Sequence, residues 1–357
     1  MPSTSYKITL AMPVYNVEKY IKRALLSALN QTFNSIEYLL IDDKGSDNSI
    51  NVAKEIINNH PRGKDVRILD HGINRGTGAT KNTAMDNARG EYLFFMDSDD
   101  EITPDCIQLL YDKMMETPVD FVAGSIDYIT IDGKIDAKRT YRYSHSDLLI
   151  KSVKFAVAEA YYLNNKRIAT PTWNKLYNLD FLRKKYIRCI PDHLNEDLYF
   201  HRQIVLNADS CRLLPDKTYI YYQAERSTCN RMGIEFTEKF AMQFTEIYCH
   251  LKDYSSLYKY CSFFSELILR NYFESINYMI MIFNSRYIPE RQKQSCILNI
   301  SKYPILFSDI KNINNQLLHI ILYLISKIPI IYFKMFLYKV LLRLQSTKNI
   351  LVNRKNT

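Results

Sequence analysis

The stretch EYLFFMDSDDEITPD, residues 91–105, is the most informative part of the sequence. Residues 92–96 are all apolar or aromatic, whereas three of the four residues at 97–100 are aspartates. Neighbouring carboxylates repel one another and raise each other's pKa unless a positive charge lies among them. The sequence therefore predicts a buried strand that runs directly into a cation-binding site.

Strands and helices alternate on both sides of this stretch. Apolar runs predict strands at 7–15, 36–43, 66–72, 91–97 and 120–129, and helical spacing predicts helices at 17–29, 49–60, 78–90 and 103–116. Ser46 or Asp47 is expected to cap the second helix, Gly90 to close the third, and Thr103 to cap the fourth with Pro104 at its first position. This alternation predicts an α/β fold with a mostly parallel sheet flanked by helices.

Polar residues follow three of the predicted strands: Tyr15 and Asn16, then Asp42 and Asp43, then residues 97–100. Ligands of such sheets bind beyond the carboxyl ends of the strands, so these residues are expected to converge on one site. The first strand is not followed by GxGxxG, and GxxxxGK[ST] does not occur in the sequence. A phosphate ester would therefore be held by a divalent cation on the aspartates instead of a backbone nest.

The chain resembles the family 2 glycosyltransferases with the GT-A fold, a Rossmann-like α/β fold. The resemblance runs from about residue 7 to 227 and is carried by PVYN at 13–16, SALNQTF at 27–33, IDDKGSDNS at 41–49, NRGTGATKN at 74–82, DSDD at 97–100, WNKLY at 173–177 and NED at 195–197. It implies a nucleotide-sugar-binding and catalytic domain at 1–229, with a donor half at about 1–130 and an acceptor half at about 131–229.

The resemblance also implies roles for single residues on the donor side. Pro13, Tyr15 and Asn16 match the nucleotide-binding segment, and Asp43 matches the aspartate that accepts a hydrogen bond from uracil N3. Lys81 and Ser98 match positions near the phosphates, where family members commonly carry arginine in place of Lys81. Asp97 and Asp99 form the DxD motif, with Asp99 favoured as the direct ligand of Mn²⁺ or Mg²⁺. Asp43 could instead begin a turn, and Asp99 and Asp100 could be first-turn charges of the following helix.

On the acceptor side, the resemblance implies an inverting reaction. Asp197, in the pair with Glu196, matches the proposed catalytic base, which takes the proton of the acceptor hydroxyl. Trp173, Asn174 and Lys175 match the wall of the acceptor site. Two structural alternatives remain open: residues 195–204 also resemble a helix start capped by Asn195, and Trp173 could serve core packing.

The C-terminal part, residues 230–357, carries all of the net charge of +9. It holds 17 Lys and Arg against 8 Asp and Glu, whereas the first 229 residues hold 30 of each. Residues 317–344 are apolar nearly throughout, but Lys327, Lys334 and Lys339 interrupt them, which disfavours a membrane-spanning helix. We expect a helix or helix pair that lies on an anionic membrane surface. The alternative is a buried core or dimerisation bundle whose lysines point outward.

Together these features predict an inverting, metal-dependent glycosyltransferase that uses a UDP-sugar. Its acceptor would be a hydroxyl of a glycan or lipid-linked oligosaccharide in capsule, O-antigen or exopolysaccharide synthesis. The alternative is an inactive nucleotide-sugar-binding scaffold in a polysaccharide assembly complex. A nucleic-acid partner is disfavoured, because the basic region is apolar where a nucleic-acid-binding tail would be polar. Scattered cysteines and a polar N-terminus predict a cytoplasmic protein. The basic, apolar C-terminal region predicts that it is peripheral on the inner face of the bacterial plasma membrane. Whether it forms a homo-oligomer is left open.

Overall fold

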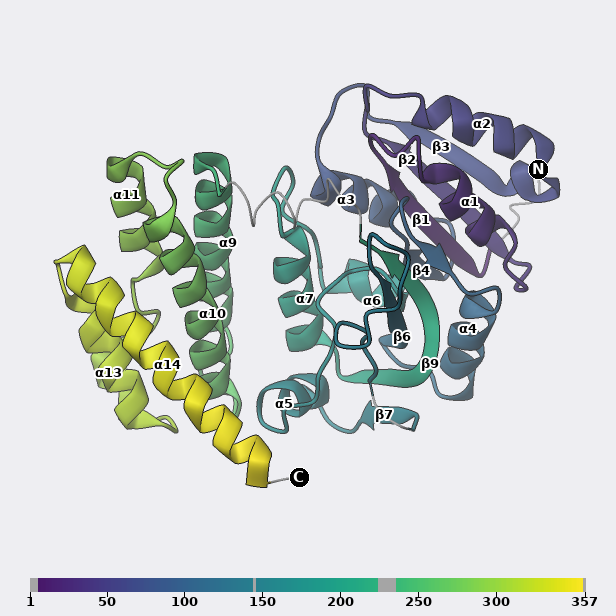
Figure 1. Ribbon diagram of the computed structural model, residues 1–357. Coiled ribbons are helices and arrows are strands. Elements are labelled where there is room, and N and C mark those ends of the chain that lie inside the picture. The colour runs from purple at the N-terminus through teal and green to yellow at the C-terminus, as the bar shows by residue number, and fades with distance from the viewer. Residues whose placement is uncertain (1–5, 144–145, 224–235, 356–357) are drawn as a thin grey trace. The chain divides into compact units, whose positions relative to one another are not determined.

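The computed structural model describes residues 6–143, 146–223 and 236–355. These fall into two compact units, Met1–Ser227 and Thr228–Thr357, and each is described by itself (Figure 1). The sequence analysis placed the boundary between the catalytic domain and the C-terminal region at 229/230. This division, and that of the catalytic domain into a donor half and an acceptor half, stay predictions.

The described residues of the first unit form a nine-stranded sheet. Its strands are β1 Ile8–Val14, β2 Ile36–Asp42, β3 Val66–Asp70, β4 Tyr92–Phe95, β5 Glu101–Ile102, β6 Phe121–Ile129, β7 Leu148–Lys151, β8 Lys175–Asn178 and β9 Ser210–Tyr222. They lie in the order β3-β2-β1-β4-β8-β6-β9-β5, and β7 pairs with β9. The pairs among β1 to β4 are parallel, whereas β8 is antiparallel to both β4 and β6. The sheet is therefore mixed, and β8 separates β4 from the fifth predicted strand, β6.

Helices flank this sheet, as predicted. They are α1 Ile21–Leu29, α2 Ser49–Asn59, the 3-10 helix η1 Pro61–Asp65, α3 Thr77–Asn87, α4 Cys106–Glu116, α5 Ala156–Tyr162, α6 Leu179–Lys184 and α7 Glu196–Asn207 (Figure 1). Every residue of β2 and nearly every residue of β1 is buried, which is the pattern of a strand covered on both faces.

Four helix ends differ from the sequence expectation. Helix α1 begins at Ile21, four residues after the predicted start, and the N-cap of α2 is Asn48 instead of Ser46 or Asp47. Helix α4 begins at Cys106 with Asp105 as its N-cap, two residues after the predicted start. Residues 101 and 102 pair with β9 as strand β5, and Thr103 N still donates to Thr218 O, so the chain leaves the sheet late. Helix α3 ends at Asn87, and Gly90 instead packs against β1, where an added Cβ would lie 2.5 Å from Thr9 N.

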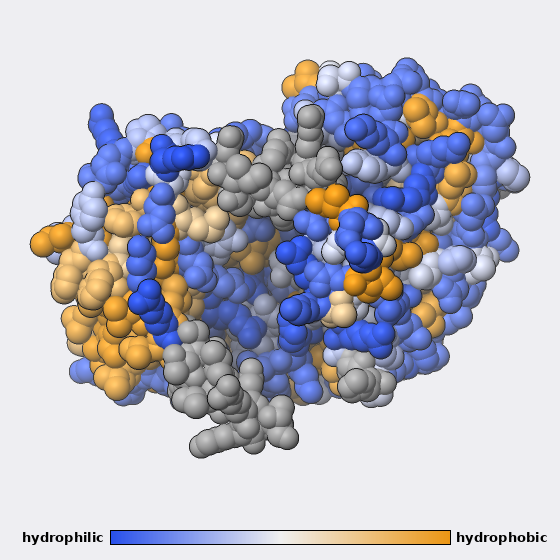
Figure 2. Space-filling view, in the orientation of Figure 1, coloured by the Kyte–Doolittle hydropathy of each residue, from blue (hydrophilic) through white to orange (hydrophobic). Residues whose placement is uncertain are grey.

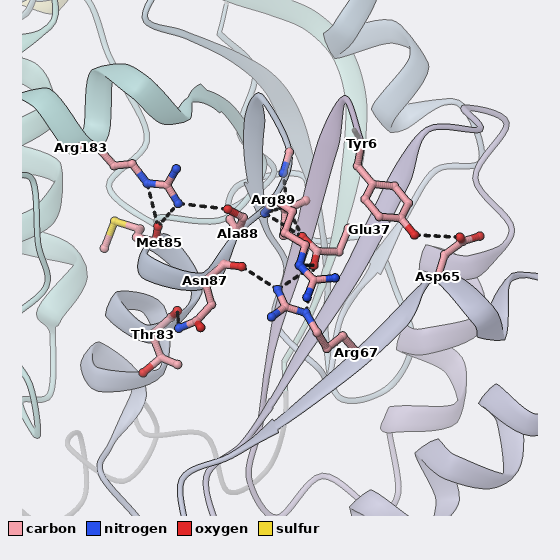
Figure 3. A network of polar contacts seen from close by, with 12 residues as sticks. Tyr6, Glu37, Asp65, Arg67, Thr83, Met85, Asn87, Ala88, Arg89 and Arg183 are labelled. Carbon is pink, nitrogen blue, oxygen red and sulfur yellow. Dashed lines mark hydrogen bonds and ion pairs between the residues drawn. The ribbon is translucent and has the colours of Figure 1, made fainter. Parts of the chain in front are cut away.

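A buried carboxylate ties the segment between α3 and β4 to the sheet (Figure 3). Glu37 on β2 is 2% exposed, and its Oε1 accepts hydrogen bonds from the Arg67 guanidinium at 2.7 and 3.0 Å. Its Oε2 accepts from Arg89 N at 2.9 Å and from Thr9 Oγ1 at 2.7 Å. Because these bonds fix the chain just before β4, they also set the position at which β4 delivers the aspartates.

The second unit is helical in its described part. It consists of α9 Glu238–Ser256, α10 Phe264–Asn284, α11 Glu290–Ile300, α12 Phe307–Ile310, α13 Gln316–Lys327 and α14 Ile331–Lys355. Helices α9, α10 and α11 pack on one another, and α14 packs on both α10 and α13. Residues 317–344, for which a helix or helix pair is predicted, belong to α13 and α14, which are separated at Pro329. Their predicted placement on a membrane stays a prediction. None of the helices in the described residues has both the length and the apolar content needed to cross a membrane.

Candidate active site

The acidic turn at the end of β4 places three carboxylates together. Oxygens of Asp97, Asp99 and Asp100 lie within 4.8 Å of one another. Asp97 and Asp99 keep part of their surface open to solvent, whereas Asp100 is buried. Helix α4 starts only at Cys106, so the alternative that Asp99 and Asp100 belong to its first turn is wrong.

Asp100 is an anchor of this turn. Its Oδ2 accepts a hydrogen bond from Tyr219 Oη at 2.9 Å, and its Oδ1 accepts one from Tyr222 N at 2.9 Å. The same Tyr219 hydroxyl accepts a hydrogen bond from Asp97 N at 3.1 Å. Both oxygens of Asp100 are therefore engaged by β9 and the residue is 0% exposed, so Asp97 and Asp99, which are partly exposed, are the carboxylates that a ligand can reach.

Arg23 on α1 supports the turn from another side. Its Nη2 donates to the backbone oxygen of Asp99 at 2.5 Å, and its guanidinium lies 3.5 Å from the ring centroid of Tyr222. The sequence analysis missed both Arg23 and Tyr219. Arg23 shows no signal in the sequence because it occupies an ordinary polar position of an amphipathic helix, and Tyr219 is one of several tyrosines in its strand.

The charges of this region favour a bound cation. Burial, together with the neighbouring carboxylates Asp99, Asp197 and Glu196, raises the pKa of Asp97 to about 7, although Lys81 opposes the shift. Burial also raises the pKa of Asp99. Two adjacent carboxylates that resist ionisation together are a donor set that suits a hard divalent cation, which prefers oxygen ligands. The residues present thus fit the Mn²⁺ or Mg²⁺ that the sequence predicts.

Lys81 on α3 joins the predicted catalytic pair. The Lys81 side chain is 2% exposed, and its Nζ lies 2.9 Å from Glu196 Oε1 and 2.6 Å from Asp197 Oδ1. Burial by itself lowers the pKa of Lys81, but the carboxylates of Asp197, Glu196 and Asp97 raise it well above its usual value. The amine is therefore charged and occupied by two carboxylates. The predicted role of Lys81 at the phosphates stays a prediction.

Glu196 and Asp197 differ in their surroundings although they are neighbours in the first turn of α7. Asn195 is the N-cap of this helix, as the structural alternative proposed, but its side chain makes no capping hydrogen bond. The Glu196 side chain is 10% exposed, and burial raises its pKa. The Asp197 side chain is 24% exposed, so Asp197 is the member of the pair that a substrate hydroxyl can reach.

The predicted acceptor residues lie beside the end of β4. Trp173 is 7% exposed and stacks on Tyr219, with ring centroids 4.3 Å apart. Asn174 is buried, and its amide bonds inside the sheet to Gly124 O at 2.8 Å and to Thr218 Oγ1 at 2.6 Å. Trp173 therefore has the packing role that was left open as an alternative. A role of either residue at an acceptor stays a prediction.

Lys175 is a buried amine at the start of β8, and its Nζ donates to Pro171 O. Burial lowers its pKa to about 7, although the Asp197 carboxylate acts in the opposite direction. A lysine with this pKa is about half protonated near neutral pH. Lys175 is thus a much weaker source of positive charge than Lys81.

Replacing Lys175 with methionine is expected to stabilise the protein most at low pH. The pKa of Lys175 is about 7 in the folded state and 10.5 in its unperturbed form. The unfolded state therefore binds more protons between these values, and wild-type stability rises with pH there by about 1.4 kcal/mol per unit. The gain in unfolding free energy of Lys175→Met over wild type should be largest at pH 6 and smaller at pH 9. Urea unfolding at both pH values measures it, with the exposed Lys54→Met as control. A gain that stays constant with pH would contradict the expectation.

The predicted nucleotide residues lie at the ends of β1 and β2. Pro13 pairs in register with Ile41, Tyr15 is 48% exposed, and Asn16 Oδ1 accepts a hydrogen bond from Ser46 N at 2.7 Å. This bond joins the loop after β1 to the loop after β2. Ser98 is buried within the acidic turn.

Asp43 holds the loop that follows β3. Its Oδ1 lies 2.8 Å from His71 Nδ1 and accepts from Arg75 N at 2.8 Å, and its Oδ2 accepts from Gly76 N at 2.9 Å. The local turn that was the alternative for Asp43 is made by Asp42, which accepts from Lys44 N. A carboxylate offers about four acceptor positions, so Asp43 can accept one further hydrogen bond. Its predicted bond to uracil stays a prediction, and among the described residues Asp43 makes no hydrogen bond or ion pair with the acidic turn.

Comparisons with known proteins agree with this architecture. The model of the family "Glycosyl transferase family 2" matches residues 9–184. An uncharacterized glycosyltransferase of Haemophilus influenzae is 34% identical over 126 residues, which cover 35% of this chain and 49% of that protein. The poly(ribitol-phosphate) beta-glucosyltransferase of Bacillus spizizenii is 27% identical over 220 residues, which cover 60% of this chain and 32% of that protein. The chain thus spans about half or less of the length of these relatives.

Among solved structures, S. aureus TarS 1–349 in complex with UDP-GlcNAc superposes with a TM-score of 0.61 at 18% sequence identity, and the match covers 90% of each chain. This likeness concerns the fold. Together with the family match and with the sheet that carries DSDD at the end of β4, it assigns residues 9–184 to glycosyl transferase family 2, in a chain that has the GT-A fold.

Proposed function

We propose that the protein is an inverting glycosyltransferase that moves a sugar from a UDP-sugar to a hydroxyl of a bacterial surface glycan or its lipid-linked precursor. The observation that carries the proposal is the division of carboxylates around the end of β4. Asp97 and Asp99 lie together and partly exposed in the turn after β4, whereas Asp197 lies on α7 and is bound by the Lys81 amine. Such a division suits a reaction that needs one group for the leaving phosphate and another for the attacking hydroxyl.

On the donor side, Asp97 and Asp99 would hold the divalent metal, which when bound supplies positive charge to the leaving nucleoside diphosphate. Tyr219, Asp100 and Arg23 keep the turn in the shape that presents these carboxylates. Asp43 has one free acceptor position for the uracil imide, and the exposed Tyr15 ring can cover the base. A UDP donor is further supported by TarS, which is solved with UDP-GlcNAc.

On the acceptor side, Asp197 accepts the proton of the attacking hydroxyl while the Lys81 amine, 2.6 Å away, keeps the carboxylate oriented. The ammonium also compensates the negative charge of Glu196, which would otherwise compete for that proton. The acceptor class is supported by the poly(ribitol-phosphate) beta-glucosyltransferase relative, whose name describes glucosyl transfer to poly(ribitol-phosphate). We place the enzyme on the inner face of the plasma membrane, where such acceptors are built.

Stabilisation by nucleotide tests the donor side directly. We expect UDP with Mn²⁺ to raise the melting temperature by several degrees, because a ligand at 100 times its Kd stabilises the folded state by about 2.7 kcal/mol. UDP alone, or GDP, CMP and dTDP with Mn²⁺, should raise it much less. Asp99→Asn should remove the effect of Mn²⁺ and keep the melting temperature without ligand.

Asp105→Asn is the matched control, since Asp105 is an exposed carboxylate six positions away that keeps the acceptor for its Thr103 partner as asparagine. A metal-dependent shift that survives in Asp99→Asn would disprove the metal role. Nucleotide stabilisation without turnover on any glycan acceptor would instead support the inactive scaffold.

A further inference from the structure

Helix α13 has two different faces. Its buried residues include His319, whose Nδ1 bonds to Tyr303 Oη at 2.5 Å and whose Nε2 bonds to Ser265 Oγ at 2.9 Å. Leu317 and Leu324, seven positions apart on the same side of the helix, are 73% and 57% exposed. The helix is therefore packed on one side and exposes leucines on another.

Helix α14 repeats this arrangement. On its inner face, Tyr338 is buried and its hydroxyl bonds to Tyr272 Oη at 2.7 Å. On its outer face, Phe333, Phe336 and Leu344 are 51%, 59% and 63% exposed at spacings of three and eight residues. Figure 2 shows hydrophobic residues gathered over α13 and α14. Because the inner face is tied down, the exposed face is a fixed surface, which we call the α13–α14 face.

The lysines of this region are placed in a way that neither sequence alternative described. Lys334 points inward, is 1% exposed and donates to Ser301 Oγ at 3.2 Å and Ser326 O at 3.0 Å. Lys327 at the end of α13 is exposed. Lys327 thus points outward, as expected of a core bundle, whereas Lys334 does not. The pair of helices is both core and surface.

Residues 310–357, which include α13 and α14, carry charge of one sign. No acidic residue follows Asp309 in the sequence, whereas eight Lys and Arg do. A second copy of the same face would bring like charges together, which disfavours self-association. An anionic lipid surface offers both the apolar layer that the exposed leucines and phenylalanines need and the opposite charge.

We infer that the α13–α14 face docks the protein on an anionic lipid bilayer, with both helices lying in the interface. Helix α13 has 12 residues and is about 18 Å long, short of the roughly 30 Å of a bilayer core, so it cannot span it. The inference rests on the proposed function only for its purpose, which is to bring the active site to a membrane-borne acceptor. Docking itself requires no turnover and can be tested without it.

Vesicle sedimentation of the full-length protein tests the docking. We expect binding to vesicles of phosphatidylcholine and phosphatidylglycerol, weak binding to phosphatidylcholine alone, and loss of affinity between 0.1 and 0.5 M NaCl. Phe333→Asp/Phe336→Asp should lower the lipid affinity at least tenfold, and Leu317→Ser/Leu324→Ser should lower it by a similar factor. Both changes are at exposed positions, so the thermal unfolding transition and the stabilisation by UDP with Mn²⁺ should stay as in wild type.

Tyr186→Asp is the matched control, because Tyr186 is an aromatic side chain of the first unit that is 84% exposed. The docking inference fails if both double variants bind vesicles like wild type, or if neutral vesicles bind as tightly as anionic ones. It also fails if wild type is a dimer in solution that the double variants convert to monomers while vesicle binding is unchanged. If UDP with Mn²⁺ did not stabilise the wild-type protein, this would count against the proposed function, but the result on vesicle docking would still hold.

Discussion

Asp197→Asn is expected to lower turnover by about 10²–10⁴, the usual contribution of a positioned base. Asparagine keeps the size of Asp197 but cannot accept a proton, and Lys81 retains Glu196 as a charged partner at 2.9 Å. The donor site should be unaffected, so stabilisation by UDP with Mn²⁺ should match wild type. To measure turnover, the UDP-sugar that stabilises the protein most is mixed with glycan acceptors, and the initial rate of UDP release is recorded for wild type and variant.

Glu196→Gln separates the two members of the pair. Glu196 is more deeply buried than Asp197 and holds Lys81, so its loss should reduce turnover less than the loss of Asp197. If Glu196→Gln lost more turnover than Asp197→Asn, Glu196 would be the base and Asp197 the residue that holds Lys81. Turnover at wild-type level in both variants would place the base elsewhere.

Lys81→Met is expected to damage both stability and turnover. Removing one partner of a buried ion pair leaves an uncompensated charge and destabilises proteins by about 3–5 kcal/mol. Here the methionine would leave two carboxylates beside one another, with the Asp97 carboxylate close enough to act on them. Urea unfolding at pH 7 should show this loss, and UDP release should fall because Asp197 loses its orientation.

The pH dependence of Lys81→Met follows from Glu196. Burial already raises the pKa of Glu196 in wild type, and loss of the ammonium raises it further. A carboxyl whose folded pKa lies above its unfolded value contributes stability at low pH that is lost as pH rises through the folded pKa. The deficit of Lys81→Met should therefore be smaller at pH 5 than at pH 8. Lys81→Arg should recover part of the stability, and Lys54→Met, an exposed change of the same kind, should have little effect. An equal deficit at both pH values would rule out this account.

The sequence allowed most of the first half of the fold to be predicted, because β1 to β4 and α1 to α3 depend on local periodicity and on runs of apolar residues. The same reasoning placed the DSDD turn at a strand end. It failed where partners are distant: the start of α4 is delayed because residues 101–103 pair with β9, more than 100 positions away. The engagement of Lys81 by Glu196 and Asp197, 115 and 116 positions on, left no local signal either.

The candidate site shows the same limit at the level of single side chains. Asp97 and Asp99 were recognised because charge at the end of a core strand is unusual. Asp100 has the same side chain in the same turn, but its different task depends on Tyr219 and Tyr222. Trp173 was recognised by its motif, yet its stacking on Tyr219 follows from the pairing of distant strands.

The dependence of the acidic turn on β9 bears on how the protein is made. Among the described residues, the Asp100 carboxylate accepts its hydroxyl and amide hydrogen bonds from residues 219 and 222, near the end of the last strand of the first unit. A chain emerging from the ribosome exposes all three aspartates long before either donor has been synthesised. The nascent chain should therefore complete its acidic turn late, after residues 219 and 222 have been synthesised.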